Sequence, residues 1–172
     1  MASEPSWHQQ NEALAASVAP APYDETGGAG VPMIDVFTAA GTFTDMHALA
    51  CMLAQELLDV YGLKDNAWLR QNTATYIHEW PTSAFANANG DSDYIRVRVL
   101  TAAGALSREQ KIETVGRLTA AIAQAPGNPP PPERIWVILT EAADTGWGLA
   151  GHAHTTDDLY QKCAEPASPN AQ

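Results

Sequence analysis

The stretch V-F-T-A-A-G-T-F-T, from Val36 to Thr44, returns 63 residues later as V-L-T-A-A-G-A-L-S, from Val99 to Ser107. Self-similarity at a fixed offset indicates that one supersecondary unit occurs twice in the chain. In each copy an alternating strand leads into a glycine turn and then into an amphipathic helix. A further strand follows each helix, so the sequence predicts one β-α-β unit followed by another.

These patterns set bounds on the expected elements. Opening strands are predicted at Met33–Thr38 and Tyr94–Leu100, and closing strands at Thr73–Trp80 and Arg134–Thr140. The first helix should run from Thr44 to about Tyr61 and stop at Gly62, because glycine is favoured just past a helix end.

The second helix has clearer signals. Ser107 and Gln110 have the spacing of a capping box, in which each side chain satisfies a free backbone amide of the first turn. An apolar stripe is predicted on this helix at Ile112, Val115, Leu118 and Ile122. We expect the helix to end before Pro126.

Two right-handed β-α-β units predict an α+β fold built from α/β-type units, with a four-stranded sheet and both helices on one face. The opposite face should remain apolar and uncovered. The residues that need cover are Ile34, Val36, Val97 and Val99, or the alternate residues of the same strands. Because so small a domain buries that face only against another subunit, the pattern predicts an oligomer.

Composition narrows the classes of protein and partner. The 172 residues suffice for one domain with a real core. The 20 Asp and Glu against nine Lys and Arg argue against a nucleic-acid partner, because that affinity comes largely from clustered cations. The longest apolar runs fall far short of the roughly 20 residues that span a bilayer, and no signal peptide is recognisable. The two cysteines, Cys51 and Cys163, lack metal-ligand spacing, so we expect a reducing, cytoplasmic setting without a membrane partner.

Residues 1–31 are rich in Ala, Pro, Gly, Ser and Glu and show no sustained period. On composition such a segment cannot bury enough surface to order itself, so we expect a flexible extension, either a removable leader or a misassigned start. The same reasoning predicts a flexible tail at 161–172. The folded domain is then expected at 32–160.

Four motifs carry a resemblance to a known family. In the second copy they are L-S-R-E-Q-K at Leu106–Lys111, I-W-V-I-L-T-E at Ile135–Glu141 and G-W-G-L-A-G at Gly146–Gly151, and in the first copy P-M-I-D-V-F at Pro32–Phe37. The chain resembles the tautomerase superfamily of 4-oxalocrotonate tautomerase. Because two copies are fused, its closer likeness is to malonate semialdehyde decarboxylase and cis-3-chloroacrylic acid dehalogenase. The resemblance implies a tautomerase/MIF-like fold, a homotrimer and a cofactor-independent isomerase or lyase.

The resemblance makes Pro32 the expected proton carrier. A terminal secondary amine that is partly desolvated and near cations has its pKa lowered from about 8 toward neutrality, so it works as a general base or acid. An amide nitrogen can do neither, and in this chain Val31 precedes Pro32. Either translation begins at Val31, whose codon in high-GC genomes often serves as a start, and Pro32 becomes terminal, or Pro32 is an ordinary strand-edge proline.

Catalysis of this kind also needs cations that hold a substrate carboxylate and stabilise enolate charge. Arg96 and Arg98 share one face of the second opening strand and are the first candidates for that catalytic role. The alternative for this pair is a solvated or subunit-interface face. Arg134 and Arg70 are further candidates for substrate binding.

The remaining candidates are weighed against structural roles. Trp147 lies where the superfamily places a pocket aromatic, and Asp35 could polarise a water or a leaving group. Glu79 and Glu141 lie at matching strand ends in the two copies, which favours a structural role at least as strongly as a role in acid–base catalysis. A third well-spaced ligand is missing beside His152 and His154, so we expect neither a metal nor any other cofactor.

Two classes of function remain open. The first is acid–base catalysis on a small enolisable or unsaturated acid or ketone, by keto–enol tautomerisation, hydration or decarboxylation, with Pro32 as proton carrier. The second is a tautomerase-fold protein without a free proline amine, either non-catalytic or recruited to another reaction such as a biosynthetic cyclisation. In both cases we expect the chain to associate with itself, and in the first to bind a small-molecule substrate.

Overall fold

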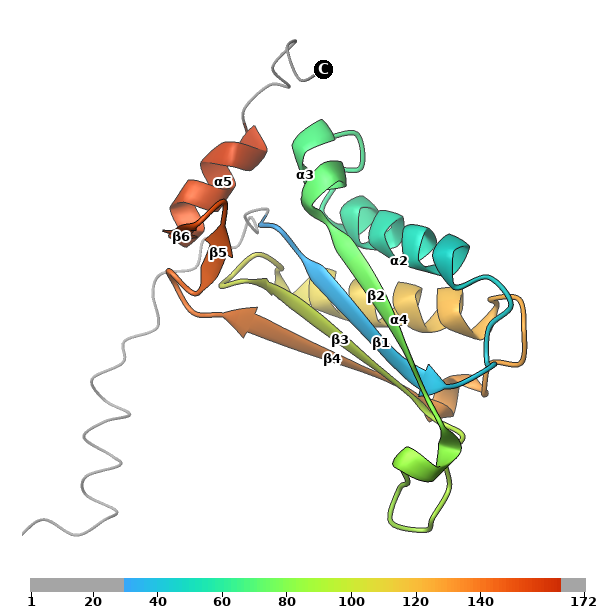
Figure 1. The fold of residues 1–172 in the computed structure, drawn as a ribbon. Helices are drawn as coiled ribbons and strands as arrows, with labels where there is room; N and C mark the ends of the chain where they lie inside the picture. Colours follow the sequence, from blue (N-terminus) through green and yellow to red (C-terminus); the bar gives the residue numbers. More distant parts are fainter. Residues whose placement is uncertain (1–29, 165–172) are drawn as a thin grey trace, which may run out of the picture.

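The computed structural model describes residues 30–164 and places a four-stranded mixed sheet at the centre of the molecule (Figure 1). The strands lie in the order β2-β1-β3-β4, with β1 at Met33–Ala39, β2 at Ala74–Trp80, β3 at Ile95–Ala102 and β4 at Ile135–Ala142. β1 pairs in parallel with β2, and β3 in parallel with β4. The antiparallel pair β1–β3 joins the two repeats at the middle of the sheet.

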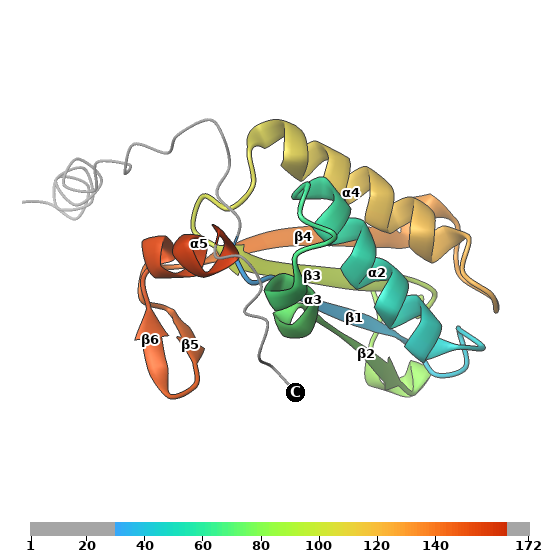
Figure 2. The same ribbon diagram turned by 90° about the horizontal axis from the view of Figure 1, so that it is seen from above.

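Both long helices cover the same face of this sheet (Figure 2). They are α2, Met46–Val60, in the first repeat and α4, Arg108–Ala123, in the second. The Asp45 side chain caps α2 by accepting a hydrogen bond from the amide of Ala48, and the predicted capping box of Ser107 and Gln110 begins α4. The predicted α+β fold, two β-α-β repeats with both helices on one face, is confirmed.

The core lies between the sheet and these helices. Ile34, Val36, Val97 and Val99 are fully buried there, and such side chains each contribute about 1.5 to 3 kcal/mol to folding. The apolar stripe predicted on α4 is only half correct. Its buried residues are Thr114, Leu118 and Ile122, whereas Ile112 and Val115 are 59% and 38% exposed. Residues four apart share a helix face, and the 114–118–122 series is the one that meets the sheet.

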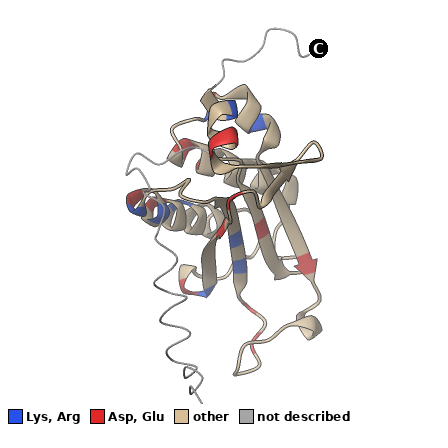
Figure 3. Ribbon diagram, turned by 90° about the vertical axis from the view of Figure 1, so that its left-hand side faces the viewer, with Lys and Arg blue, Asp and Glu red and all other residues tan. Residues whose placement is uncertain are grey.

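The other face of the sheet is uncovered in one chain, but it is not the apolar face that we predicted. Arg96 and Arg98 project from it between apolar neighbours, because β3 alternates arginine with buried valine. Charged segments therefore run through the middle of the sheet (Figure 3). The large exposed side chains of the two edge strands are Tyr76, Trp80, Trp136 and Ile138.

Short elements that were not predicted gather at the end of the sheet where β1 begins (Figures 1 and 2). They are α3 at Ala67–Asn72, β5 at Trp147–Leu149, β6 at His152–His154 and α5 at Thr156–Ala164. Helix α5 continues past the domain boundary predicted at residue 160 and buries Cys163. Two single-turn helices, η1 at Thr82–Ala84 and η2 at Pro132–Arg134, precede the second repeat and β4.

Most of the predicted extension, and the end of the predicted tail, lie outside the described residues. Within residues 30–164 no helix is both long enough and apolar enough to cross a membrane.

Candidate active site

Pro32 lies directly before β1 and is buried, together with the two residues that precede it. The side chain of Val31 is 3% exposed and packs in an apolar cluster with Ala102, Ala105 and Leu159. A Cβ atom on Gly30 would lie 2.7 Å from the Cβ of Ala102, closer than real Cβ contacts, so this position accepts glycine. In the chain as it stands, the nitrogen of Pro32 is an amide that carries no basic lone pair.

Three aromatic residues surround the Val31 cluster. Tyr61, Trp68 and Trp147 are partly buried and pack against it. The structure thus brings the predicted pocket residue Trp147 to the chain segment just ahead of Pro32. It is carried there by the hairpin of β5 and β6, whose strands pair from Trp147 to His154.

Tyr61 is a residue that the sequence argument missed. Its hydroxyl is buried and has no hydrogen-bond partner among the described residues. Burial, and then the nearby Tyr160, Cys163 and Glu141, raise the pKa of this phenol above its ordinary value. The hydroxyl therefore stays protonated at neutral pH and is available as a hydrogen-bond donor. Its only sequence signal was its position at the end of α2, directly before Gly62.

The four predicted arginines do not converge on Pro32 within one chain. Arg98 lies opposite Asp35 of β1, and Asp35 is about 10 Å along the strand from Pro32. Arg96 lies opposite Phe37, which is about 16 Å along the strand from Pro32. Arg134 lies at the far end of the sheet and contacts Asp91 and Asp93 at 3.4 Å.

Arg70 lies on α3, where its guanidinium donates a hydrogen bond to the backbone oxygen of Lys64 at 3.2 Å. It borders a surface hollow between α2 and β2 that also includes His47 and Cys51. Asp35 is paired with His78, whose Nε2 lies 2.7 Å from the aspartate Oδ1. Neither residue contacts the Val31 cluster among the contacts that the structure provides.

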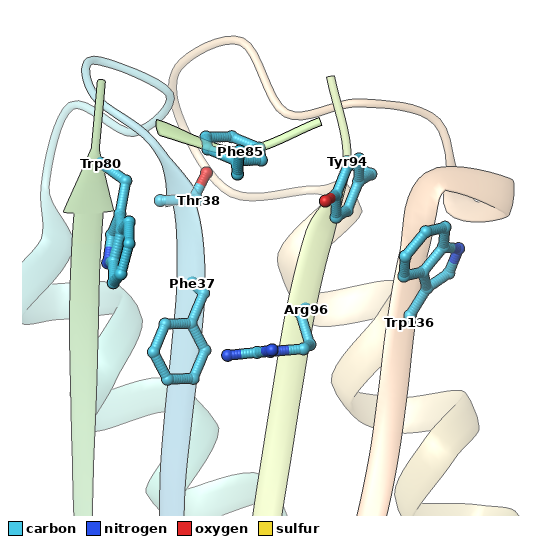
Figure 4. A pocket seen from close by; sticks show the side chains of 7 residues that line it. All are labelled: Phe37, Thr38, Trp80, Phe85, Tyr94, Arg96 and Trp136. Atoms are coloured by element: carbon cyan, nitrogen blue, oxygen red, sulfur yellow. The ribbon is translucent and has the colours of Figure 1, made fainter. Parts of the chain in front are cut away.

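A second concave site lies at the opposite end of the open sheet face (Figure 4). This aromatic pocket is a cavity of about 230 Å³ lined by Phe37, Thr38, Trp80, Phe85, Tyr94, Arg96 and Trp136. Tyr94 and Trp136 stack with ring centroids 4.4 Å apart, and Phe85 meets Tyr94 edge-on at 5.4 Å. Sequence reasoning had singled out Arg96 alone, because the other residues meet only through strand register and the loop between the repeats.

The matching glutamates have structural contacts. Glu141 accepts a hydrogen bond from the amide of Gly104 at 3.2 Å and pairs with Lys111 at 2.8 Å. His152 and His154 lie on β6 with ring centroids 6.5 Å apart. In the part of the chain that the structure describes, no three His, Cys, Asp or Glu side chains come together as a metal site would require.

Comparisons with known proteins agree with this architecture. Residues 94–156, the second repeat, match the family model described as Tautomerase enzyme. The second repeat thus resembles the tautomerase superfamily, and the fold of the two repeats together is shared with fused 4-OT and malonate semialdehyde decarboxylase. Members of this superfamily are generally isomerases or lyases. A comparison with curated proteins found no match.

Solved structures with the same fold are distant in sequence. A fused 4-OT described as an asymmetric trimer is 19% identical with a TM-score of 0.58, over 70% of this chain and 94% of that one. Malonate semialdehyde decarboxylase is 17% identical with a TM-score of 0.53, over 69% and 90% of the two chains. A macrophage migration inhibitory factor-like protein from Entamoeba histolytica is 15% identical with a TM-score of 0.55, over 73% and 97%.

Proposed function

We propose that this protein catalyses cofactor-independent proton transfer on a small enolisable or unsaturated acid or ketone. The reaction is keto–enol tautomerisation, or the related hydration or decarboxylation. Pro32 is the proton carrier, in a form of the chain that begins at Pro32. The observation that carries the proposal is the packing of Val31 in an apolar cluster directly ahead of Pro32, beside Trp147.

Removal of the chain up to Val31 would have two consequences at this point. The Pro32 nitrogen would change from an amide to a secondary amine, which can accept and return a proton. The volume now filled by the Val31 side chain would open beside that amine, between aromatic walls that keep out water. Such partial desolvation lowers the pKa of an amine toward neutrality, which suits a general base.

Two further groups are assigned roles in this proposal. The protonated Tyr61 hydroxyl, buried without a partner among the described residues, can donate a hydrogen bond to an oxygen that gains negative charge in the transition state. Arg98 is the nearer of the two β3 arginines to Pro32 and is the proposed partner of a substrate carboxylate.

The test compares three purified proteins: the full chain, a chain expressed as Met-Pro32 onward, and its Pro32→Ala version. Intact mass establishes that the initiator methionine has been removed. We expect phenylpyruvate or 2-hydroxymuconate to be turned over, or an acetylenic acid hydrated, by the Met-Pro32 product alone. Equal activity of that product and its Pro32→Ala version would show that Pro32 carries no proton. The mass of the protein isolated from its own cells reports whether the native chain begins at Pro32.

A second candidate function is a tautomerase-fold protein in which Pro32 stays an amide, non-catalytic or recruited to another reaction. The close approach of Gly30 to Ala102 favours it, because a retained segment would use such packing. Gly30→Val distinguishes the two. The substitution is made in the gene and the protein is isolated from its own cells. Its melting temperature should fall if the native chain keeps the segment and stay the same if the segment has been removed.

We also propose that the chain forms a homotrimer in a reducing, cytoplasmic setting. The trimeric state of the fused 4-OT supports this, as do Tyr76 on β2 and Ile138 on β4, two large side chains outside the aromatic pocket that a single chain leaves exposed. Light scattering should give three times the mass of the chain at micromolar concentration, and a monomer would contradict the proposal.

A further inference from the structure

The aromatic pocket contains one cation whose hydrogen-bonding groups are unused. Arg96 makes no ion pair and no hydrogen bond with any residue in the range 30–164, and its one defined contact is with an aromatic ring. A guanidinium offers five N–H donors in one plane, and such donors pair best with the two oxygens of a carboxylate. The arginine is therefore positioned but has no anionic partner of its own.

Strand register holds this cation in place. His78 on β2, Phe37 on β1 and Arg96 on β3 are direct neighbours across the sheet. The Phe37 ring stacks on the His78 ring at a centroid distance of 4.6 Å, and the Arg96 guanidinium lies 4.2 Å from the Phe37 centroid. A guanidinium held against a ring keeps its N–H edge free, so this stack presents donors to the cavity at little cost in side-chain entropy.

The rest of the cavity is suited to a flat ring. Trp80 stands on one side, the stacked pair of Tyr94 and Trp136 on the other, and Phe85 across the end of the strands (Figure 4). The two tryptophans remain 46% and 43% exposed in this chain, so a ligand would bury their surface. Aromatic walls around a single anchored cation select a ring that carries an anionic group.

We propose that the aromatic pocket binds a small planar aromatic carboxylate, with its ring between Trp80 and Trp136 and its carboxylate on Arg96. The site is separate from the proposed Pro32 site, because Phe37 lies about 16 Å along β1 from Pro32. Binding therefore requires neither a free amine nor catalysis.

The experiment titrates the full chain with 2-naphthoate, and separately with the neutral 2-naphthamide, by calorimetry. A ligand of this size should bind with a Kd of about 10 µM to 1 mM. Arg96→Gln should weaken 2-naphthoate about 10- to 100-fold, the equivalent of a lost charge-assisted hydrogen-bond pair, and leave 2-naphthamide unchanged. Arg108→Gln is the control, because it removes the same charge from the start of α4, outside the pocket and outside the proposed active site.

Two-dimensional NMR locates the bound ligand. The indole N–H signals of Trp80 and Trp136 should shift with 2-naphthoate, while those of Trp68 and Trp147 at the other end of the sheet stay in place.

Three results would overturn the proposal. The first is an equal loss of affinity in Arg96→Gln and Arg108→Gln, which indicates general charge attraction. The second is no binding of 2-naphthoate at concentrations up to about 5 mM, which lies beyond the expected weakest Kd of about 1 mM. The third is no binding together with a fall in oligomer mass in Trp136→Leu, which shows that another copy of the chain fills the pocket.

Discussion

The amide of Gly41 donates a hydrogen bond to the carboxylate of Glu79 at 2.8 Å, and so ties the turn after β1 to the end of β2. The second repeat makes the same bond between Gly104 and Glu141. Both glycines have left-handed φ angles, 79° and 69°, which residues with a Cβ rarely adopt. The repeated A-A-G turn therefore serves to place an amide opposite a glutamate at the end of the neighbouring strand.

Replacement of these glutamates should destabilise the fold without affecting a reaction. We expect Glu79→Ala to lower the free energy of unfolding by about 0.5 to 1.5 kcal/mol, the scale of one hydrogen bond at a partly exposed site. Glu141→Ala should have the larger effect, because Lys111 also loses its partner. Urea denaturation measures both, with Glu79→Gln expected to recover most of the loss. A Glu133→Gln control should be neutral, and equal stability of all variants would refute the structural role.

Arg117 links α4 to α2 through three carboxylates. Its guanidinium contacts Glu56 at 2.6 Å, Asp59 at 3.1 Å and Glu113 at 3.2 Å, and these bonds, that with Glu56 first, raise its pKa. Because the side chains are partly exposed, solvent screens the pairs, and we expect Arg117→Met to lose only about 1 kcal/mol.

The test of this link is chemical denaturation at low and high salt. The free energy of unfolding of Arg117→Lys should lie between those of the unsubstituted protein and Arg117→Met, since an ammonium cannot reproduce the forked geometry of a guanidinium. The matched control is Arg108→Met on the same helix, because Arg108 forms no ion pair with any residue in the range 30–164. A loss in Arg117→Met that does not shrink with added salt would contradict an electrostatic link.

The two cysteines should differ in reactivity. Cys51 is exposed on α2, whereas Cys163 is buried and burial raises the pKa of its thiol to about 11. At pH 8 only about one Cys163 in a thousand would be a thiolate, and the thiolate is the form that reacts. We expect iodoacetamide to label Cys51 well before Cys163, as mass spectrometry of peptides can follow. Similar rates for both would mean that α5 does not stay docked.

Helix α5 should loosen in acid. The Asp158 carboxylate accepts a hydrogen bond from the Thr155 amide at 2.9 Å, and the Thr155 hydroxyl accepts one from the Asp158 amide at 3.1 Å. Hydrogen bonding to the carboxylate, from the Thr155 amide first and then from the Thr155 side chain, holds the pKa of Asp158 below its usual range. A carboxyl with a depressed folded-state pKa stabilises the fold above its unfolded pKa of about 3.9 and loses that contribution as pH falls through the folded value.

Hydrogen exchange of the α5 amides, corrected for intrinsic rates, measures this effect. Exchange should rise as the pH falls below about 4. Asp158→Asn should show faster exchange already at neutral pH, whereas Asp157→Asn, one residue earlier and outside the cap, should not. If the two variants behave alike, the cap does not hold the helix.

Local signals in the sequence were enough for the architecture. The repeat, the alternation of β3 and the capping box at Ser107 each act over a few residues, so strands, turns and long helices could be bounded to within a few positions. The short elements α3, β5, β6 and α5 were missed because they are too brief to show a period and are held by packing at the end of the sheet.

Contacts between distant segments decided the rest. Only the pairing of β1 with both neighbours aligns His78, Phe37 and Arg96, residues that the chain order keeps far apart. Val31 is buried ahead of Pro32 because it packs against Leu159 of α5. Tyr61, at the end of α2, packs against the same cluster. A site is defined by distances in space, whereas periodicity reports which side of its own element a residue occupies, and for that reason the sequence determined the fold and the tertiary structure determined the sites.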